Sequence, residues 1–186
     1  MEQNLNVQHS LFVKLREEHA QIVKMMDLLD HGDLQFQKIM ELWVFAELTH
    51  HIKEEKLLFA AVASKPRLKE GGPMCSFYFD THRNLNPIER IQALLSEQIP
   101  IEAHQQLFYD LNLPLRIPTD EHRAGKAVLH RLIMQYDSIS NSDRKSLLDE
   151  YRLIQQTHLK KEETCLFHLC ANILTVAEAD QILLAW

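Results

Sequence analysis

A ten-residue pattern occurs twice in this chain and limits the folds that the sequence can adopt. The copies begin at His50 and His158, a constant offset of 108 residues, and they match at six of ten positions. In each copy the His stands four residues before a Glu, Glu54 in the first and Glu162 in the second. Residues at this spacing lie side by side on one face of an α-helix. The repeat therefore predicts two helices that each present an imidazole and a carboxylate together.

Apolar residues recur at alternating intervals of three and four, which is the pattern of helices packed in a bundle. This spacing predicts four long helices, over residues 11–30, 33–64, 119–136 and 143–174, with Thr119 as the N-cap of the third. The expected inward stripe of the first helix consists of Phe12, Leu15, His19, Ile22, Met26 and Leu29. The expected stripe of the second consists of Phe36, Met40, Trp43, Glu47, His50, Glu54, Leu57 and Ala61.

All six prolines lie between residues 66 and 118, whereas the segments on either side have none. A connector of this length is expected to hold secondary structure of its own. Proline is tolerated in a first helical turn, so short helices are predicted over residues 73–84 and 87–98, with a third over 102–110. A further short helix from Thr175 to the end is expected to pack as a lid.

No useful stretch alternates apolar and polar residues as a half-buried strand would. The predicted fold class is therefore all-α. We expect an antiparallel up-down four-helix bundle, with a proline-rich helical insertion (66–118) between the second and third main helices and a short C-terminal helix. With 186 residues and 46% hydrophobic content, residues 1–186 are expected to form a single domain.

Charge and hydropathy exclude two classes of partner. The net charge is −6 and no dense run of Lys and Arg is present, which argues against nucleic-acid binding. The longest apolar run, Leu57–Ala63, is far too short to span a bilayer. We therefore expect a cytoplasmic protein with neither nucleic acid nor membrane as a partner.

Polar residues interrupt the inward stripes where the four helices would converge. A single His on such a stripe is most often a hydrogen-bonded core residue. Two inward Glu change the argument, because a buried carboxylate without compensating charge is costly and because Lys53 and Lys161 fall off the stripes. Bound metal ions would supply the positive charge, as they do in carboxylate-bridged bundles. The predicted metal ligands are His19, His50, Glu54, His122, His158 and Glu162.

The order Glu-His on one helix and H-x-x-x-E-E-x-x-L-F on the next, twice over, resembles the hemerythrin-like (HHE cation-binding) proteins. The resemblance covers residues 12–64 and 119–174, and it includes Gly125 after the third-helix His. It implies a four-helix bundle that holds two iron ions bridged by an oxo or hydroxo group, with the same six residues as ligands. Manganese and zinc are the expected substitutes for iron.

Two alternatives concern the ligand set. Oxygen-carrying members of that family have a second third-helix His four residues after the first, where this chain has Lys126. His82 in the connector lies at a distance from His50 that also suits a third-helix ligand, so it either replaces or joins His122. Glu47, one turn before His50, is a candidate outer partner or occasional ligand. Surface or flank positions are expected for His51, His130 and His168.

Ligand counting predicts an open site. Two octahedral ions offer roughly twelve positions, of which the six residues would fill about eight if both Glu bridge. The leading interpretation is a non-haem di-iron protein that binds dioxygen, or a related small oxidant such as nitric oxide or peroxide, for sensing, storage or stress protection. A separate signalling partner protein would carry any sensing output. The alternatives are a di-iron redox enzyme, which turns over peroxide or oxidises ferrous iron, and a metal-stabilised interaction module.

Overall fold

The structure is a computed structural model that describes residues 5–30, 34–66, 68, 99–110 and 114–186. Across these residues the regular secondary structure is helical and no strand is present, which confirms the predicted all-α class. No helix within the same ranges combines the length and the apolar character needed to cross a membrane.

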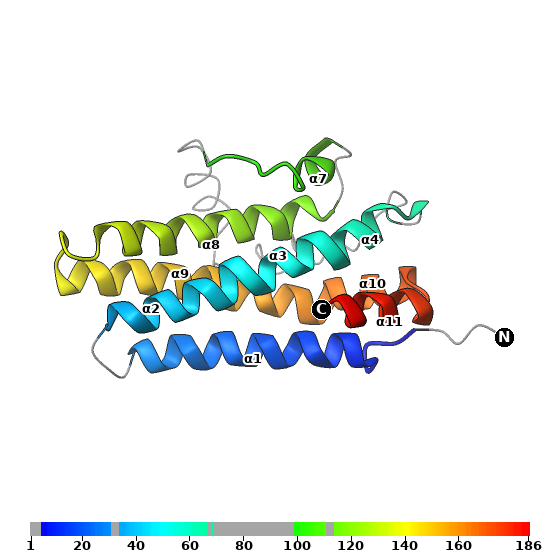
Figure 1. The fold of residues 1–186 in the computed structure, drawn as a ribbon, viewed down its shortest axis with the longest axis horizontal. Helices are drawn as coiled ribbons and strands as arrows, with labels where there is room; N and C mark the ends of the chain where they lie inside the picture. Colours follow the sequence, from blue (N-terminus) through cyan, green and yellow to red (C-terminus); the bar gives the residue numbers. More distant parts are fainter. Residues whose placement is uncertain (1–4, 31–33, 67, 69–98, 111–113) are drawn as a thin grey trace.

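Four long helical segments lie side by side and form the body of the molecule (Figure 1). The first is α1 (Ser10–Asp30) and the third is α8 (Arg116–Gln135). The second runs through α2 (Phe36–Leu42), the π-helical η1 (Trp43–His50), α3 (His51–Lys53), the π-helical η2 (Glu54–Phe59) and α4 (Ala60–Ala63). The fourth runs through α9 (Asn141–Lys161), the π-helical η4 (Glu162–Leu166) and α10 (Phe167–Ile173).

Two shorter helices pack on this body. The first, α7 (Gln106–Asp110), lies on α8 within the predicted range 102–110. The second, α11 (Val176–Ala185), contacts α1 and η2 and begins with a capping box in which Thr175 and Glu178 bond each other's backbone N–H. The helices predicted over 73–84 and 87–98 lie outside the described residues.

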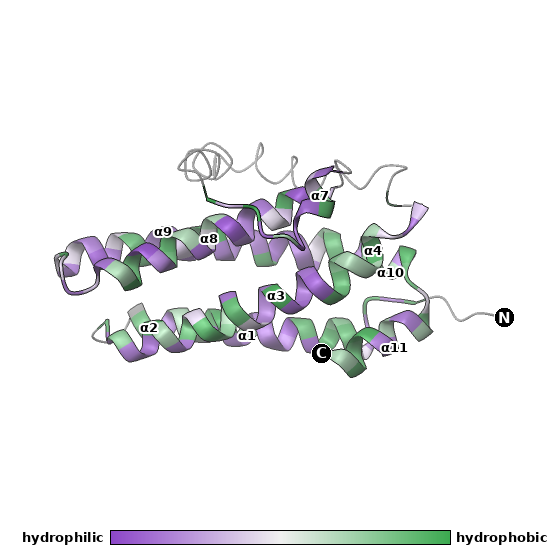
Figure 2. Ribbon diagram, turned by 45° about the horizontal axis from the view of Figure 1, so that its top comes forward, coloured by the Kyte–Doolittle hydropathy of each residue, from purple (hydrophilic) through white to green (hydrophobic). Residues whose placement is uncertain are grey.

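Two apolar clusters fill the interior and leave a polar layer between them. On α1 the first cluster contains Phe12 and Leu15 and the second contains Ile22 and Met26, with His19 between the two. The second and fourth long segments are divided in the same way, whereas α8 contributes to the second cluster and Leu115, just before α8, belongs to the first. Figure 2 shows the mixed hydrophobic and hydrophilic residues along each helix that this amphipathic packing requires. The polar layer at mid-length is where the functional side chains gather.

The buried stripe predicted for α1 is confirmed at all of its positions. The stripe predicted for the second segment is wrong at both ends, and Phe36 at its start is 44% exposed. The physical reason is the π-helical stretches η1 and η2, whose wider turns lengthen the interval between inward residues to four. From Leu42 onward the buried positions Leu42, Ala46, His50, Glu54, Leu58 and Val62 follow this interval.

The predicted N-cap of the third helix is also wrong. Helix α8 begins at Arg116, and Thr119 lies inside its first turn, where the Thr119 hydroxyl donates to the Leu115 carbonyl at 2.8 Å. Pro118 is part of the same turn. A first-turn residue has no helical acceptor for its backbone N–H, so proline is accommodated there without losing a hydrogen bond.

Candidate metal centre

The six residues predicted as metal ligands meet in the polar layer, and each is at most 3% exposed. They are His19 from α1, His50 and Glu54 from the second segment, His122 from α8, and His158 and Glu162 from the fourth segment. The π-helical stretches frame this group, since His50 ends η1 while Glu54 and Glu162 begin η2 and η4. Such π turns occur frequently at functional sites.

Glu54 faces imidazoles from three helical segments. Its Oε1 atom lies 3.5 Å from His50 Nε2 and 3.7 Å from His19 Nε2. Its Oε2 atom lies 3.5 Å from His122 Nε2. The two oxygens of one carboxylate thus point at different imidazoles, which is the arrangement that a carboxylate bridging two ions needs.

Glu162 also faces imidazoles from three helical segments. Its Oε2 atom lies 3.3 Å from His19 Nε2 and 3.4 Å from His158 Nε2. Its Oε1 atom lies 3.9 Å from His122 Nε2. Both carboxylates therefore stand between the imidazoles of the first two segments and those of the last two.

The donor atoms form two overlapping groups of four, and within each group they lie within 4.8 Å of one another. The first group is His19, His50, Glu54 and Glu162. The second group is Glu54, His122, His158 and Glu162. Because both groups contain both Glu residues, the geometry offers two cation positions that share two carboxylates.

The chemistry of the donor atoms fits a cation. Among the described residues, seven buried side-chain atoms at this centre have no hydrogen-bond partner. They are Nε2 of His19, His50 and His51 and all four carboxylate oxygens of Glu54 and Glu162. Unpartnered buried polar atoms are rare and costly in proteins. Lone pairs that converge without hydrogen-bond donors are the expected surroundings of a metal ion.

His51 is a further donor that the sequence reasoning missed, because a surface or flank position was predicted for it. The structure buries His51 at 2% exposure and stacks its ring on that of His122, with centroids 4.1 Å apart. His51, His122 and His158 form a third group with metal-ligand spacing. The second cation position therefore has three His within reach, whereas the first has two.

Every one of these five imidazoles is oriented by a carboxylate on its Nδ1 side. The pairs are His19 with Glu163 at 2.9 Å, His50 with Glu18 at 2.9 Å, His51 with Glu47 at 3.1 Å, His122 with Glu55 at 2.9 Å and His158 with Glu121 at 3.1 Å. An Nδ1–H that donates to a carboxylate leaves the Nε2 lone pair free and fixes the ring. The Nε2 atoms of His19, His50 and His51 have no hydrogen-bond partner, and those of His122 and His158 lie 3.0 Å from each other, a contact that a bound cation would replace.

Four of these outer carboxylates belong to Glu-His and Glu-Glu dipeptides that occur in both halves of the sequence. Glu18 precedes His19 and holds His50, and Glu121 precedes the third-helix His and holds His158. The second Glu of each Glu-Glu pair likewise holds the first His of the other half of the chain, as Glu163 does for His19. Each dipeptide therefore supplies a residue of the inner group and the orienting partner of another, which explains why both dipeptides recur in both halves.

Glu47, predicted as an outer partner or occasional ligand, has the first of these roles. Its Oε2 atom bonds His51, and its Oε1 atom accepts from the Tyr151 hydroxyl at 2.7 Å and from Gln155 Nε2 at 3.3 Å. Gly125 on α8 makes room for this cluster, because a Cβ there would lie 2.7 Å from Gln155 Nε2. A larger residue at position 125 would therefore displace the Gln155 amide from its place beside Glu47.

Without a bound ion the buried carboxylates and imidazoles of the centre shift one another's pKa values in both directions. Burial raises the pKa of Glu162, and the nearby Glu54 carboxylate raises it further, to about 7. Burial opposes the charged form of His122, but the hydrogen bond and charge of Glu55 outweigh it and raise that pKa to about 9. Burial and the neighbouring His122 and His51 rings hold the pKa of His158 well below its usual range. A cation between the carboxylates would relieve their mutual repulsion.

A groove of about 610 Å³ reaches the centre from the side of α1 and α9. His19 forms part of its lining, together with Arg16, Lys160 and Glu163. Glu163, whose side chain is 37% exposed, also lines the groove and bonds His19 Nδ1. Of the two four-residue groups, the groove therefore touches the one that contains His19.

Four of the remaining histidines bear on the predicted ligand set. His130 and His168 are exposed, as predicted. His104 gave no sequence signal, yet its Nε2 atom lies 2.5 Å from Glu55 Oε2, on the outer side of the centre. His82, the alternative third-helix ligand, lies outside the described residues.

No family model, curated protein or solved structure matches this chain, so the resemblance to hemerythrin-like proteins rests on the residues themselves.

Proposed function

We propose that this chain is a single-domain di-iron protein of the hemerythrin-like type, built as an antiparallel up-down four-helix bundle. One observation carries the proposal: Glu54 and Glu162 belong to both of the four-residue donor groups. A carboxylate shared between two cation positions is how dimetal centres in helical bundles are made. The ligands would be the six predicted residues together with His51.

Iron is the metal that the donor set favours. Imidazole nitrogen and carboxylate oxygen suit iron, with manganese and zinc as substitutes, whereas the hard oxygen-only ligands preferred by calcium and magnesium are not what this centre offers. Each imidazole is bonded to a carboxylate, which raises its basicity as a ligand.

The number of donors supports binding of one small ligand. Five His and two bridging Glu provide about nine of the roughly twelve positions of two octahedral ions. A bridging oxygen would take one position on each ion. The three-His ion would then be saturated, and the two-His ion would keep one position open.

A single open position favours reversible binding of a small oxidant over turnover. We therefore place dioxygen binding, or binding of nitric oxide or peroxide, ahead of the redox-enzyme alternative, with sensing, storage or stress protection as the biological use. A sensing role would require a separate partner protein. A metal-stabilised interaction module remains the non-redox alternative, and the following experiment separates the three.

The test is an absorption spectrum of the full chain, loaded anaerobically with ferrous iron, before and after exposure to air. The proposal predicts a new near-ultraviolet and visible band on exposure to air that disappears again when oxygen is removed. Continuous consumption of added peroxide would instead favour the enzyme. A spectrum unaffected by air or peroxide, with iron bound, would favour the interaction module.

A further inference from the structure

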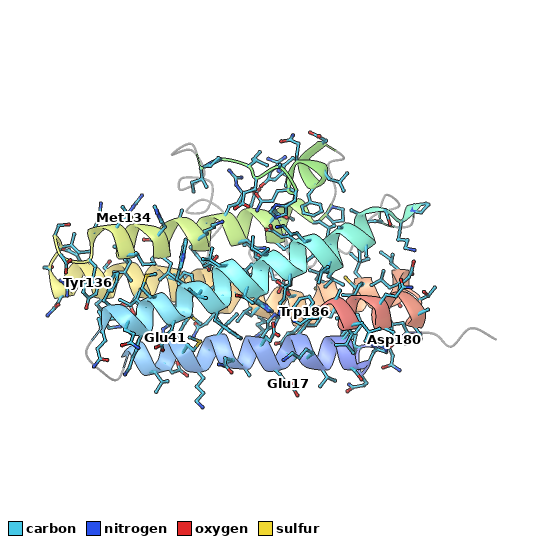
Figure 3. All side chains as sticks on the ribbon, in the orientation of Figure 1. Glu17, Glu41, Met134, Tyr136, Asp180 and Trp186 are labelled. Carbon is cyan, nitrogen blue, oxygen red and sulfur yellow. The ribbon has the colours of Figure 1, made fainter. Side chains whose placement is uncertain are left out.

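Trp186, at the end of α11, reaches the outer side of the metal centre. Its indole Nε1–H donates to Glu18 Oε1 at 2.8 Å, and Glu18 Oε2 accepts from His50 Nδ1 at 2.9 Å. The indole ring lies edge-on to the His50 ring, with centroids 6.2 Å apart. Figure 3 shows Trp186 near the middle of the long helices, between the second segment and α1. An indole, a carboxylate and an imidazole thus form one hydrogen-bonded chain.

The second half of the molecule has the same series of hydrogen bonds, but a lysine takes the place of the indole. Glu121 Oε2 accepts from His158 Nδ1 at 3.1 Å, and Glu121 Oε1 accepts from Lys161 Nζ. Lys161 is only 4% exposed, so a buried ammonium occupies the place that the indole takes beside Glu18. At the constant offset of 108 residues, the counterpart of Lys161 is Lys53.

Lys53 does not bond Glu18 as Lys161 bonds Glu121. Its Nζ atom lies over the face of the Trp186 ring, 5.5 Å from the centroid, in a cation–π contact. The Lys53 charge therefore acts on Glu18 only through space, and no direct bond between the two side chains is formed. Lys14 also lies beside Glu18, with its Nζ 3.5 Å from Oε1, but its side chain is 46% exposed, so solvent screens its charge. The indole therefore occupies the position that would otherwise suit the Lys53 ammonium.

The replacement of an ammonium by an indole N–H changes the negative charge on the carboxylate that holds His50. A buried ammonium on Glu121 draws charge away from that carboxylate, whereas a neutral indole N–H leaves more negative charge on Glu18. A more negative Glu18 holds the His50 Nδ1–H more strongly and makes His50 Nε2 a better donor to a cation. His50 belongs to the two-His group, which has fewer protein donors and gains most from a stronger one.

We propose that Trp186 is a positioning residue that acts through Glu18 and His50 to retain the ion on the two-His side, by excluding the Lys53 ammonium from Glu18. This proposal rests on the proposed dimetal function. It goes beyond that function in assigning α11 a specific effect on one of the two ions.

The test is the release of zinc from the fully loaded full-length chain to an excess of a coloured chelator. Two release phases of equal amplitude are expected for the wild type, and His51→Leu, which weakens the three-His side, identifies the phase of that ion. Trp186→Phe keeps the ring and removes the N–H. It should accelerate the phase of the two-His ion about 10- to 100-fold, as loss of an outer partner typically does, and leave the other phase unchanged. Trp43→Phe, which changes the other Trp of the chain, is the control and should change neither phase.

Lys53 provides a second, independent readout. Lys53→Met alone should leave both phases within about twofold of the wild type, because the Lys53 ammonium is not bonded to Glu18 while Trp186 is present. Because the proposal has the Lys53 ammonium move onto Glu18 in Trp186→Phe, the double variant Trp186→Phe/Lys53→Met should recover part of the lost retention. No recovery would contradict the exclusion of Lys53.

Two results would overturn the proposal. Equal acceleration of both phases in Trp186→Phe, with a lowered melting temperature, would mean that Trp186 only anchors α11. Unchanged phases in Trp186→Phe would mean that the hydrogen bond to Glu18 has no effect on retention. Failure of the dimetal function is distinguishable from both, because the wild type would then release a single ion or none.

Discussion

His51 Nδ1 lies 3.1 Å from Glu47 Oε2, and this pair has no equivalent in the second half of the chain. At the offset of 108 residues, Leu159 replaces His51 and Gln155 replaces Glu47. The second half thus has an apolar residue in place of the His and a neutral residue in place of its orienting carboxylate. This pair makes an otherwise two-fold arrangement asymmetric, with three His on one side and two on the other.

Replacing His51 by Leu, the residue at its counterpart position, should remove this asymmetry. The variant is expected to bind two ions still, but to lose the ion of the three-His group about 10- to 100-fold faster, because one of its protein donors is gone. Metal release to a chelator measures this rate. His130→Leu, which changes an exposed His, is the matched control. Unchanged release from His51→Leu would show that His51 is a core residue and not a ligand.

Replacing Glu54 by Gln should abolish binding of both ions together. The side chain keeps its shape but loses its charge, and Glu54 belongs to both four-residue groups. Elemental analysis after loading with iron measures the result. The control is Glu41→Gln, at an exposed position on α2. Loss of only one ion from Glu54→Gln would contradict the bridging role.

Stability of the metal-free protein should depend on pH through Glu162. Its pKa is raised from 4.5 to about 7, so the folded state holds this proton more tightly than the unfolded state does. The resulting stabilisation is fully present below about pH 4.5 and is lost as the pH rises through about 7. Chelator-treated wild type should therefore lose more unfolding free energy between pH 5 and 8 than Glu162→Gln, which has no such proton.

In the metal-loaded protein the stability should change with pH in the opposite direction. Metal ions compete with protons for the same carboxylates, so stability of the loaded protein should rise with pH over this window. Urea unfolding at several pH values measures both trends. Parallel curves for metal-free wild type and Glu162→Gln would contradict the raised pKa of Glu162.

The sequence predicted the helices and the buried His and Glu residues that meet at mid-length because both follow helical periodicity. His19, His122 and His158 stand on apolar stripes, and burial of those stripes brings them together. His51 could not be found in this way, because it directly follows His50 and lies about a hundred degrees around an α-helix from it. The π-helical turns of the second segment, which the sequence did not reveal, shift the inward positions and bring both residues to the centre.

Lys161 shows a second limit of periodicity. It was predicted to lie off the stripe, yet it is buried beside Glu121. A stripe indicates which residues face the core but not which flanking residues reach a partner on a neighbouring helix. Trp186 escaped prediction for the same reason, since its contact with Glu18 joins positions 168 residues apart.

Two single variants test whether His122 or His82 is the third-helix ligand. Because His122 Nε2 lies 3.0 Å from His158 Nε2 and 3.5 Å from Glu54, His122→Ala should remove a donor from the three-His group and weaken the absorption band of the iron-loaded protein. His82→Ala should leave that band intact. Spectra at identical iron loading measure both. An unchanged band in His122→Ala together with its loss in His82→Ala would reverse the assignment.

The most direct measurement is the number of iron ions that each chain retains after anaerobic loading and removal of excess metal. Two overlapping donor groups that share Glu54 and Glu162 predict two tightly held ions per chain. Retention of one ion or none would contradict the dimetal centre on which the proposed function depends.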